Sequence, residues 1–309
     1  MPNAPVSQPR PVKVSDELFA PVSPDIELCY QTFGDADDEP LLLVMGLGAP
    51  MTWWDDELCE QLAREGFLVI RFDNRDAGRS SRGTGRVTRR LLVRAYTGLP
   101  VRAPYTLDDM ATDAFGLLDH LGLESAHVAG VSMGGMIVQS MALQSPARVR
   151  SMASIMSTTG RRSVGWQHPV LFRNLLASSR GREGYLRSSV ATARLIGSPG
   201  YPQSLEKTEQ RAADTYDRGV SLAGLTRQMA AIVTQPDRTP RLRALHVPTV
   251  VVHGLADKMV HVSGGRATAA AVPGADLLLV DGMGHDLPPQ LFDTFTRAIA
   301  TNARRTTPR

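Results

Sequence analysis

The stretch AHVAGVSMGG, residues 126–135, decides the fold that we predict for this chain. It begins as an apolar run, continues as Gly-x-Ser-x-Gly around Ser132, and passes at Met133 into helical spacing. A serine in a tight turn between a buried strand and a helix is strained, and its hydroxyl stands above the carboxyl edge of a sheet. The start of the helix adds partial positive charge beneath any anion formed there. The stretch therefore predicts a nucleophilic serine, with a glycine-rich turn that only packs the helix on the strand as the alternative.

Strands and helices alternate on both sides of this stretch. Apolar runs predict strands over residues 26–33, 41–44, 67–72, 126–131, 149–156, 249–253 and 277–280. Helical spacing predicts helices over residues 54–64, 107–121, 133–144, 265–271 and 289–300. This alternation is typical of an α/β fold, with a mostly parallel sheet and helices on both faces. A mainly helical segment interrupts it between residues 157 and 245 and is too long for a connecting loop, so we expect an inserted helical cap.

Composition and length place the chain among soluble globular proteins. Of the 309 residues, 42% are hydrophobic and 21% are charged, and no apolar run reaches the roughly 18 residues of a membrane span. The first residues do not form a secretory signal, and two cysteines cannot form a disulfide framework, so we expect a cytoplasmic protein. The predicted organisation is a loose N-terminal arm (1–22), a core (23–156 and 246–302), the cap (157–245) and a C-terminal tail (303–309).

A serine hydroxyl is a weak nucleophile without a neighbouring base. Of the seven histidines, His285 lies in a loop directly after the predicted strand 277–280, at the sheet edge where Ser132 should emerge. A surface histidine with no role is the alternative for this position. Asp281 and Asp286 flank His285 in the sequence, and we expect both to point elsewhere. His285 is therefore the predicted base.

The third member of such a site must orient the imidazole and stabilise its cation. Asp257 follows the predicted strand 249–253, whereas the loop after the preceding strand, residues 154–160, contains no acidic residue. The chain order Ser132, Asp257, His285 is the order that this arrangement requires. Asp257 is therefore the predicted acid.

Acyl transfer also needs N–H donors for the negative oxygen of the tetrahedral intermediate. One donor should be the backbone N–H of Met133, directly after the nucleophile. The second should come from the glycine-rich turn after the strand 41–44, where we select the N–H of Leu47 between two glycines. This chemistry needs no metal ion and no organic cofactor.

These residues give the chain a resemblance to the α/β-hydrolase superfamily, over residues 26–302. The shared landmarks are the turn that holds Leu47, the segment 73–80 after the next strand, the Gly-x-Ser-x-Gly elbow, and the late Asp and His loops. The resemblance implies that Ser132 is the nucleophile, Asp257 the acid and His285 the base. It also implies an acyl-enzyme mechanism.

Within the superfamily the chain most resembles the LipG-type esterase/lipase group and the aclacinomycin methylesterase group. In those groups, as here, Met-Gly replaces the more common His-Gly at positions 45–46. The Arg-rich stretch before residues 105–110 and the segment 281–288 are similar to the LipG-type proteins. We interpret Asp73 and Arg75, within the segment 73–80, as an internal brace.

The expected function is hydrolysis of small-molecule or lipid carboxylic esters with a hydrophobic part, by a carboxylesterase or lipase. The cap should form the pocket, although the same apolar pattern would also suit packing within the cap. A C–C bond hydrolase or a cofactor-free perhydrolase with the same triad, and a ligand-binding protein on this fold, remain alternatives. The serine at position 132 excludes epoxide hydrolases and haloalkane dehalogenases, which need a carboxylate nucleophile. The apolar cap residues are Trp166, Leu171, Phe172, Leu175, Leu176, Leu195, Ile196, Leu225 and Met229.

A basic patch is the remaining feature of the sequence. Seven arginines fall within residues 79–102, and no acidic residue lies between Asp76 and Asp108. One hypothesis is an amphipathic flap that makes weak peripheral contact with anionic lipid or anionic substrates. We favour a solvated, arginine-rich loop. Only one aromatic residue, Tyr96, is interleaved with these arginines, which argues against nucleic-acid binding. The oligomeric state stays open.

Overall fold

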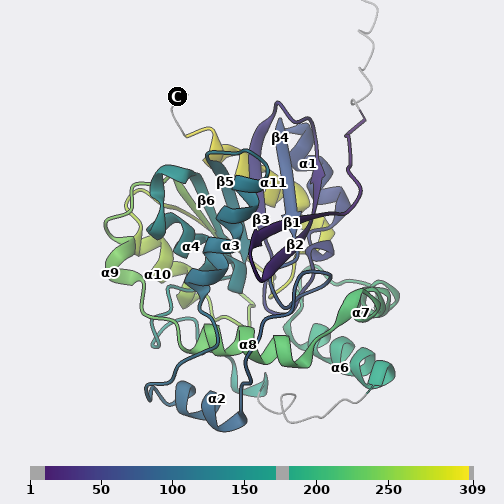
Figure 1. The fold of residues 1–309 in the computed structure, drawn as a ribbon, viewed down its shortest axis with the longest axis vertical. Coiled ribbons are helices and arrows are strands. Elements are labelled where there is room, and N and C mark those ends of the chain that lie inside the picture. The colour runs from purple at the N-terminus through teal and green to yellow at the C-terminus, as the bar shows by residue number, and fades with distance from the viewer. Residues whose placement is uncertain (1–10, 172–180, 306–309) are drawn as a thin grey trace, which may run out of the picture.

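The protein is built on one eight-stranded sheet, as the computed structural model shows for residues 11–171 and 181–305 (Figure 1). The strand order is β1-β2-β4-β3-β5-β6-β7-β8; the pairs β1–β2 and β2–β4 are antiparallel and the other pairs are parallel. The strands are β1 (Leu18–Ser23), β2 (Ile26–Phe33), β3 (Glu39–Val44), β4 (Phe67–Phe72), β5 (Ala126–Val131), β6 (Val149–Ile155), β7 (Thr249–Gly254) and β8 (Asp276–Val280).

Helices cover both faces of this sheet. Along β3, Leu42 and Val44 join one hydrophobic cluster and Leu41 and Leu43 join the other, because successive side chains of a strand point to opposite faces. The first cluster contains α3 (Leu107–His120), α4 (Met133–Gln144) and the end of α10 (Ser263–Ala271); the second contains α1 (Asp56–Arg64) and α11 (Phe292–Ala303). All of β5 is buried. The predicted α/β fold, with a mostly parallel sheet between helical layers, is confirmed.

The chain leaves the sheet after β6 and returns to it in β7. We call residues 157–245 the inserted segment; its helices α6, α7 and α8 lie together beyond one end of the sheet (Figure 1). Buried ion pairs join it to the loop after β4, with Arg218 Nη2 2.8 Å from Asp73 and Arg227 Nη2 2.6 Å from Asp76. The helices are α6 (Gly181–Ile196), α7 (Leu205–Gly219), α8 (Leu222–Val233) and α9 (Thr239–Leu242).

Both ends of the chain are more ordered than predicted, where the structure describes them. The loose arm expected over residues 1–22 is wrong for residues 18–22, which belong to β1, with Ala20 fully buried. Proline is tolerated in an edge strand, and the presence of Pro21 is the reason why the sequence did not predict β1. At the other end, Arg304 pairs with Glu65 and Arg305 with Asp276, so these two residues do not form a loose tail. Residues 1–10 and 306–309 lie outside the described part.

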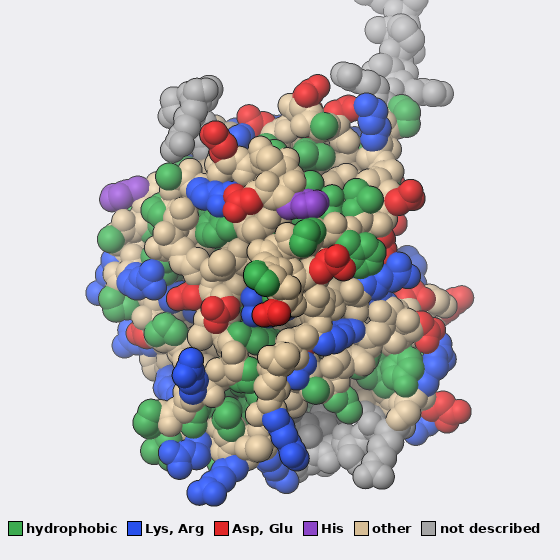
Figure 2. Space-filling model, viewed as in Figure 1, with side chains coloured by type: hydrophobic (Ala, Val, Ile, Leu, Met, Phe, Trp, Pro, Cys, Tyr) green, Lys and Arg blue, Asp and Glu red, His purple; other side chains and the backbone are tan. Residues whose placement is uncertain are grey.

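The sequence favours a solvated loop for the Arg-rich stretch, but part of this stretch is helical in the structure. It contains α2 (Arg89–Tyr96), whose last carbonyls, those of Ala95 and Tyr96, accept hydrogen bonds from Arg162 of the inserted segment. Val93 and Tyr96 are 56% and 59% exposed, and basic side chains crowd the end of the molecule where α2 lies (Figure 2). In the described part of the chain, no helix combines the length and the apolar character needed to cross a bilayer. Contact of the Arg-rich stretch with lipid stays a prediction.

Candidate active site

Ser132 occupies a strained turn between β5 and α4. Its φ of 58° and ψ of −117° lie where residues other than glycine are rare. The neighbouring glycines are required sterically: a Cβ at Gly130 would lie 2.2 Å from a backbone oxygen of α4, and one at Gly135 would lie 2.5 Å from the Ser157 side chain. Ser132 N donates to the carbonyl of Ile155 at 2.9 Å. The packing of β5, α4 and the end of β6, with Ser157 directly after it, therefore fixes the serine at the carboxyl end of β5.

The structure brings Ser132, His285 and Asp257 into one hydrogen-bonded chain. Ser132 Oγ lies 2.9 Å from His285 Nε2, and His285 Nδ1 lies 2.7 Å from Asp257 Oδ2. Because a carboxylate can only accept, Nδ1 carries the proton and Nε2 is left with a lone pair toward the serine hydroxyl. The other oxygen of Asp257 accepts the backbone N–H groups of Met259 and Val260 at 2.8 and 2.9 Å. Both carboxylate oxygens of Asp257 therefore accept hydrogen bonds. The bond to Nδ1 fixes the orientation of the His285 imidazole.

Two histidines keep Asp257 ionised in a buried position. The Asp257 side chain is fully buried, and burial alone would raise the pKa of its carboxyl group. The charges and hydrogen bonds of His285 and His253 outweigh burial and hold the pKa of Asp257 below its ordinary value. His253 Nε2 lies 3.4 Å from Asp257 Oδ2 and donates to the carbonyl of Val260 at 2.8 Å. At neutral pH, a negative charge therefore stands behind His285.

The loop that carries His285 is tied to the inserted segment. The backbone N–H of His285 donates to the carbonyl of Ile196 at 2.7 Å, and the N–H of Gly284 donates to Ser198 Oγ at 2.8 Å. Ser198 Oγ in turn donates to the carboxylate of Asp286, which also accepts from Gln203. Asp286 therefore points away from the imidazole, as the sequence predicted.

The turn after β3 lies against the candidate nucleophile. A Cβ placed on Gly46 would lie only 3.2 Å from the Cβ of Ser132. The next N–H along the chain, that of Leu47, makes no hydrogen bond with any other described residue. The N–H of Met133 is the first of α4 and precedes the first hydrogen bond of the helix. Leu47 thus follows the residue that contacts Ser132, Met133 follows Ser132 itself, and neither N–H has a hydrogen-bond partner among the described residues.

Three side chains hold this turn, residues 45–51, and the sequence did not assign this role to any of them. Asn74 Nδ2 donates to the carbonyl of Met45 at 2.9 Å, and Asp73 Oδ1 accepts from Met51 N at 2.6 Å. Gln228 Oε1 accepts from the N–H of Gly48 at 2.7 Å. Asn74 and Asp73 follow β4, so the segment 73–80 could have indicated their role in the sequence. Gln228 lies in α8, and no local sequence pattern indicates its role.

The predicted brace has two separate halves. Asp73 pairs with Arg218 of α7, as described above, while the guanidinium of Arg75 binds both carboxylate oxygens of Asp113 in α3 at 2.5 Å. Asp73 therefore braces the inserted segment and Arg75 braces the core. Both side chains are internal, but they do not pair with each other.

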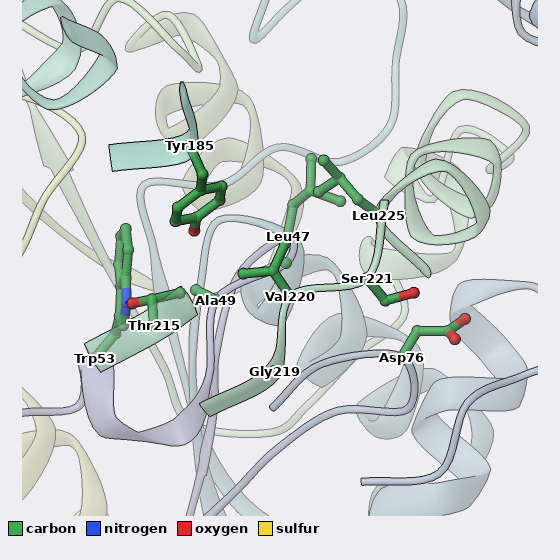
Figure 3. A pocket seen from close by; sticks show the side chains of 11 residues that line it. Leu47, Ala49, Trp53, Asp76, Tyr185, Thr215, Gly219, Val220, Ser221 and Leu225 are labelled. Carbon is green, nitrogen blue, oxygen red and sulfur yellow. The ribbon is translucent and has the colours of Figure 1, made fainter. Parts of the chain in front are cut away.

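A pocket with a volume of about 120 Å³ adjoins the turn after β3 (Figure 3). Leu47 and Leu225 lie close together at one end, and Trp53 and Tyr185 lie on the other side. The carboxylate of Asp76 points away from the pocket in this view and is bound by Arg227 and Tyr105. The lining residues are Leu47, Gly48, Ala49, Trp53, Asp76, Tyr185, Thr215, Gly219, Val220, Ser221 and Leu225.

The described pocket contains part of the apolar set predicted for it. Of the apolar residues predicted from the inserted segment, Leu225 lines this pocket. Phe172, Leu175 and Leu176 lie outside the described residues. Over residues 11–171 and 181–305, no group of three or more His, Cys, Asp or Glu side chains is placed to hold a metal ion.

Comparisons with known proteins agree with this architecture. The family model described as "alpha/beta hydrolase fold" matches residues 39–289. The chain is 28% identical to rhodomycin D methylesterase of Streptomyces sp. strain C5, over 92% of this chain and 97% of that protein. It is 25% identical to 3-oxoadipate enol-lactonase 2 of Acinetobacter baylyi, over 89% and 93% of the two chains. A solved esterase from Thermogutta terrifontis aligns with a TM-score of 0.70 and 23% identity, covering 94% of this chain and 99% of that one.

Proposed function

Because the chain belongs to the α/β-hydrolase family, we propose that it is a serine hydrolase that cleaves carboxylic esters with an apolar part. One observation carries this proposal. The chain of hydrogen bonds from Ser132 through His285 to Asp257 ends at a buried carboxylate, and the N–H groups of Leu47 and Met133 have no hydrogen-bond partner within residues 11–171 and 181–305. A nucleophile, a base, an orienting acid and oxyanion donors are the full set that acyl transfer needs.

The proposed reaction uses each group in turn. His285 Nε2 takes the proton of Ser132 as the oxygen attacks the ester carbonyl, and Asp257 stabilises the resulting imidazolium. The N–H groups of Leu47 and Met133 bind the negative oxygen of the tetrahedral intermediate. His285 then protonates the departing alcohol, and a water molecule activated by the same histidine releases the acid. At the end of the cycle Ser132 again carries its hydroxyl proton and His285 is again neutral.

The relatives and the pocket support an ester substrate with an uncharged part. A methylesterase and a lactonase, as their names state, both act on carboxylic esters. Leu47, whose N–H is a proposed donor, also lines the pocket. The only charged side chain among the described lining residues, Asp76, is paired with Arg227. An apolar or aromatic group suits such a lining better than a carboxylate or phosphate, which would lose its hydration without gaining a partner.

The test is hydrolysis of p-nitrophenyl esters from acetate to laurate by the wild-type protein and Ser132→Ala. We expect kcat to fall on the order of 10⁶-fold in this variant. Ser140→Ala is the matched control, because it makes the same change in the adjoining helix at a buried hydroxyl with no hydrogen-bond partner. This control should retain wild-type turnover and wild-type labelling by a fluorophosphonate probe.

The outcomes separate the alternatives. Turnover that survives in Ser132→Ala would contradict the serine mechanism. No turnover on any ester, with no labelling of Ser132, would favour a ligand-binding protein. Labelling without ester turnover would favour a different bond, such as the C–C bond of the alternative hydrolases.

The proposed substrate class has its own measurement. Phenyl butyrate and 4-carboxyphenyl butyrate differ by one carboxylate, and we expect the neutral ester to have the higher kcat/KM. The physical reason is that no unpaired cation lines the described part of the pocket to bind the added charge. Equal or higher kcat/KM for the carboxylate ester would contradict an uncharged binding site.

A further inference from the structure

We propose that Gln228 of α8 is a positioning residue that holds the turn after β3 in its oxyanion-binding geometry. The inserted segment would then control the rate of the chemical step as well as the shape of the pocket. This inference rests on the proposed serine-hydrolase function, since it concerns the N–H of Leu47 as an oxyanion donor.

Gln228 forms a bridge between two backbone groups of the core. Its side chain is fully buried; Oε1 accepts from the N–H of Gly48 at 2.7 Å, and Nε2 donates to the carbonyl of Arg75 at 2.7 Å. An N–H can only donate and a carbonyl can only accept, so these partners fix which way the amide group points. Both ends of one side chain therefore join α8 to the loops after β3 and β4.

The contact at Gly48 lies one residue from the proposed donor. Leu47 stands between Gly46, which lies against Ser132, and Gly48, which Gln228 holds. Gly48 has a φ of +67°, and a Cβ there would lie 2.7 Å from Leu225 Cδ1, so α8 packs directly on the turn. The peptide groups on either side of Leu47 are thus confined between the nucleophile and α8. The direction of the Leu47 N–H depends on both contacts.

The other two supports act at the ends of the turn. Asn74 binds the carbonyl of Met45 and Asp73 binds the N–H of Met51, so the core side chains hold the first and last residues. Among the described side chains, only Gln228 bonds to the backbone between them. The residue next to it, Arg227, anchors α8 through its ion pair with Asp76. A shift of α8 would therefore be transmitted to Gly48 and onward to Leu47.

Loss of the bridge should reduce transition-state binding more than substrate binding. A displacement of about 1 Å in a positioned group can cost 10²-fold in rate, and the oxyanion exists only after attack on the carbonyl. For Gln228→Met, which keeps the length of the side chain but makes neither bond, we expect kcat/KM to fall about 10- to 100-fold. The loss should appear in kcat, with KM changed by less than about threefold.

Gln139→Met is the matched control. Gln139 is also fully buried, and its amide makes two side-chain hydrogen bonds, with Arg238 at 3.1 Å and with Ser154 at 3.2 Å, neither of which touches the turn. Both variants remove the same group from a buried site, and thermal unfolding reports the stability cost of each. Only Gln228→Met should lose kcat on a p-nitrophenyl ester.

Two inhibitors separate the oxyanion site from general disorder of the pocket. A trifluoromethyl ketone forms a hemiketal with the serine and places a negative oxygen between the donors, whereas the ether analogue of the substrate binds without reacting. In folded Gln228→Met, the Ki of the ketone should rise by the same factor by which kcat/KM falls, and the Ki of the ether should stay within about twofold. If Gln228→Met does not fold, Gln228→Asn carries the same test, because its shorter arm cannot span both partners.

Several results would overturn the inference. They are wild-type kcat/KM in a folded Gln228 variant, an unchanged Ki for the ketone, or an equal loss of kcat in Gln139→Met. Each of these leaves ester hydrolysis by Ser132 standing. Absence of turnover and of Ser132 labelling in the wild-type protein is a separate result, which would overturn the proposed function and this inference together.

Discussion

Ser132 and the two loops that face it lie in one site, but different parts of the chain hold them. The nucleophile is fixed at the end of β6: its N–H binds the carbonyl of Ile155 in the core, and its carbonyl accepts at 2.8 Å from the Oγ of Ser157, the first residue of the inserted segment. The turn after β3 and the loop that carries His285 each take a bond from the inserted segment, through Gln228 and through Ile196. The core supplies the residues of the site, and the inserted segment aligns two of its three loops.

This division has a consequence for how the site is assembled. The elbow can form as soon as β5, β6 and α4 pack together. The turn after β3 and the loop of His285 each have a hydrogen bond to a helix of the inserted segment, so we expect them to reach the described geometry only when α8 and α6 are in place. Burial opposes ionisation of Asp76, yet Arg227 and Tyr105 hold the pKa of this carboxyl group below its ordinary value, so the anchor of α8 stays charged at neutral pH. Changes in the inserted segment should therefore alter rate as well as specificity.

Among the changes that test this division, we expect the largest effect at Asp257, the orienting acid, which the core places. Asp257→Asn keeps the shape of the side chain, but an amide can present its N–H₂ group to His285 and favour the wrong tautomer. We expect kcat to fall about 10⁴-fold, the loss that the same change causes in the triad of chymotrypsin-type serine proteases. The measurement is kcat on the preferred p-nitrophenyl ester, with circular dichroism as the control for folding. A loss of less than tenfold would show that Asp257 does not orient the base.

The same carboxylate should make the core stability depend on pH. Its pKa in the folded protein lies below the ordinary value of 3.8, so the folded state binds fewer protons than the unfolded state near that pH. The stabilisation is fully present above about pH 5 and is lost as the pH falls through the folded value. Urea unfolding from pH 7 to pH 3 should show that the wild-type protein has a larger free energy of unfolding than Asp257→Asn, and that this difference becomes smaller below about pH 4. An advantage independent of pH would contradict an ionised, paired carboxylate.

A smaller effect should follow when the loop of His285 loses one contact with the inserted segment. In Ser198→Ala the N–H of Gly284 and the carboxylate of Asp286 lose their shared partner, so the adjacent imidazole is held less firmly. We expect kcat/KM to fall roughly tenfold, since small misalignments of a positioned group are costly. Ser151→Ala is the control, because its buried hydroxyl bonds to His127 within the sheet. Equal losses in the two variants would mean that the contact from the inserted segment has no special role.

The comparison also explains which parts of the site were predictable. The elbow is local: its glycines, serine and flanking strand and helix lie within 126–144, so residue spacing alone indicated it. Asp257 and His285 could be found because each follows a strand at the same sheet edge. Gln228 lies 180 positions from Gly48, and its partner is a backbone N–H that carries no residue identity. No pattern in a single sequence marks such a contact.

In the fold, too, the buried strands could be predicted from local sequence, whereas β1 and α2 could not. The buried strands were predicted because apolar residues run along both of their faces. The edge strand β1 was missed because Pro21 and its exposed side chains resemble a loop, although Ala20 is fully buried. Helix α2 was not predicted because its arginines are typical of a solvent-exposed loop. Arg162, which donates to the last carbonyls of this helix, lies far along the chain. Pairing with the adjacent strand β2 orders β1, whereas the described contact of α2 comes from a residue far along the chain.

The last prediction compares two glycines with similar backbones and different surroundings. Gly48 and Gly66 both have positive φ, at +67° and +93°, but a Cβ at Gly48 would lie 2.7 Å from Leu225 whereas nothing lies within 4 Å of one at Gly66. Alanine at either position should cost about 1–2 kcal/mol of unfolding free energy from backbone strain. Only Gly48→Ala should also lower kcat, by about three- to tenfold, because Leu225 and α8 must shift against the turn. Adding Leu225→Ala to Gly48→Ala should recover part of that kcat, and a double variant no better than the single one would show that strain within the turn, rather than contact with α8, limits the rate.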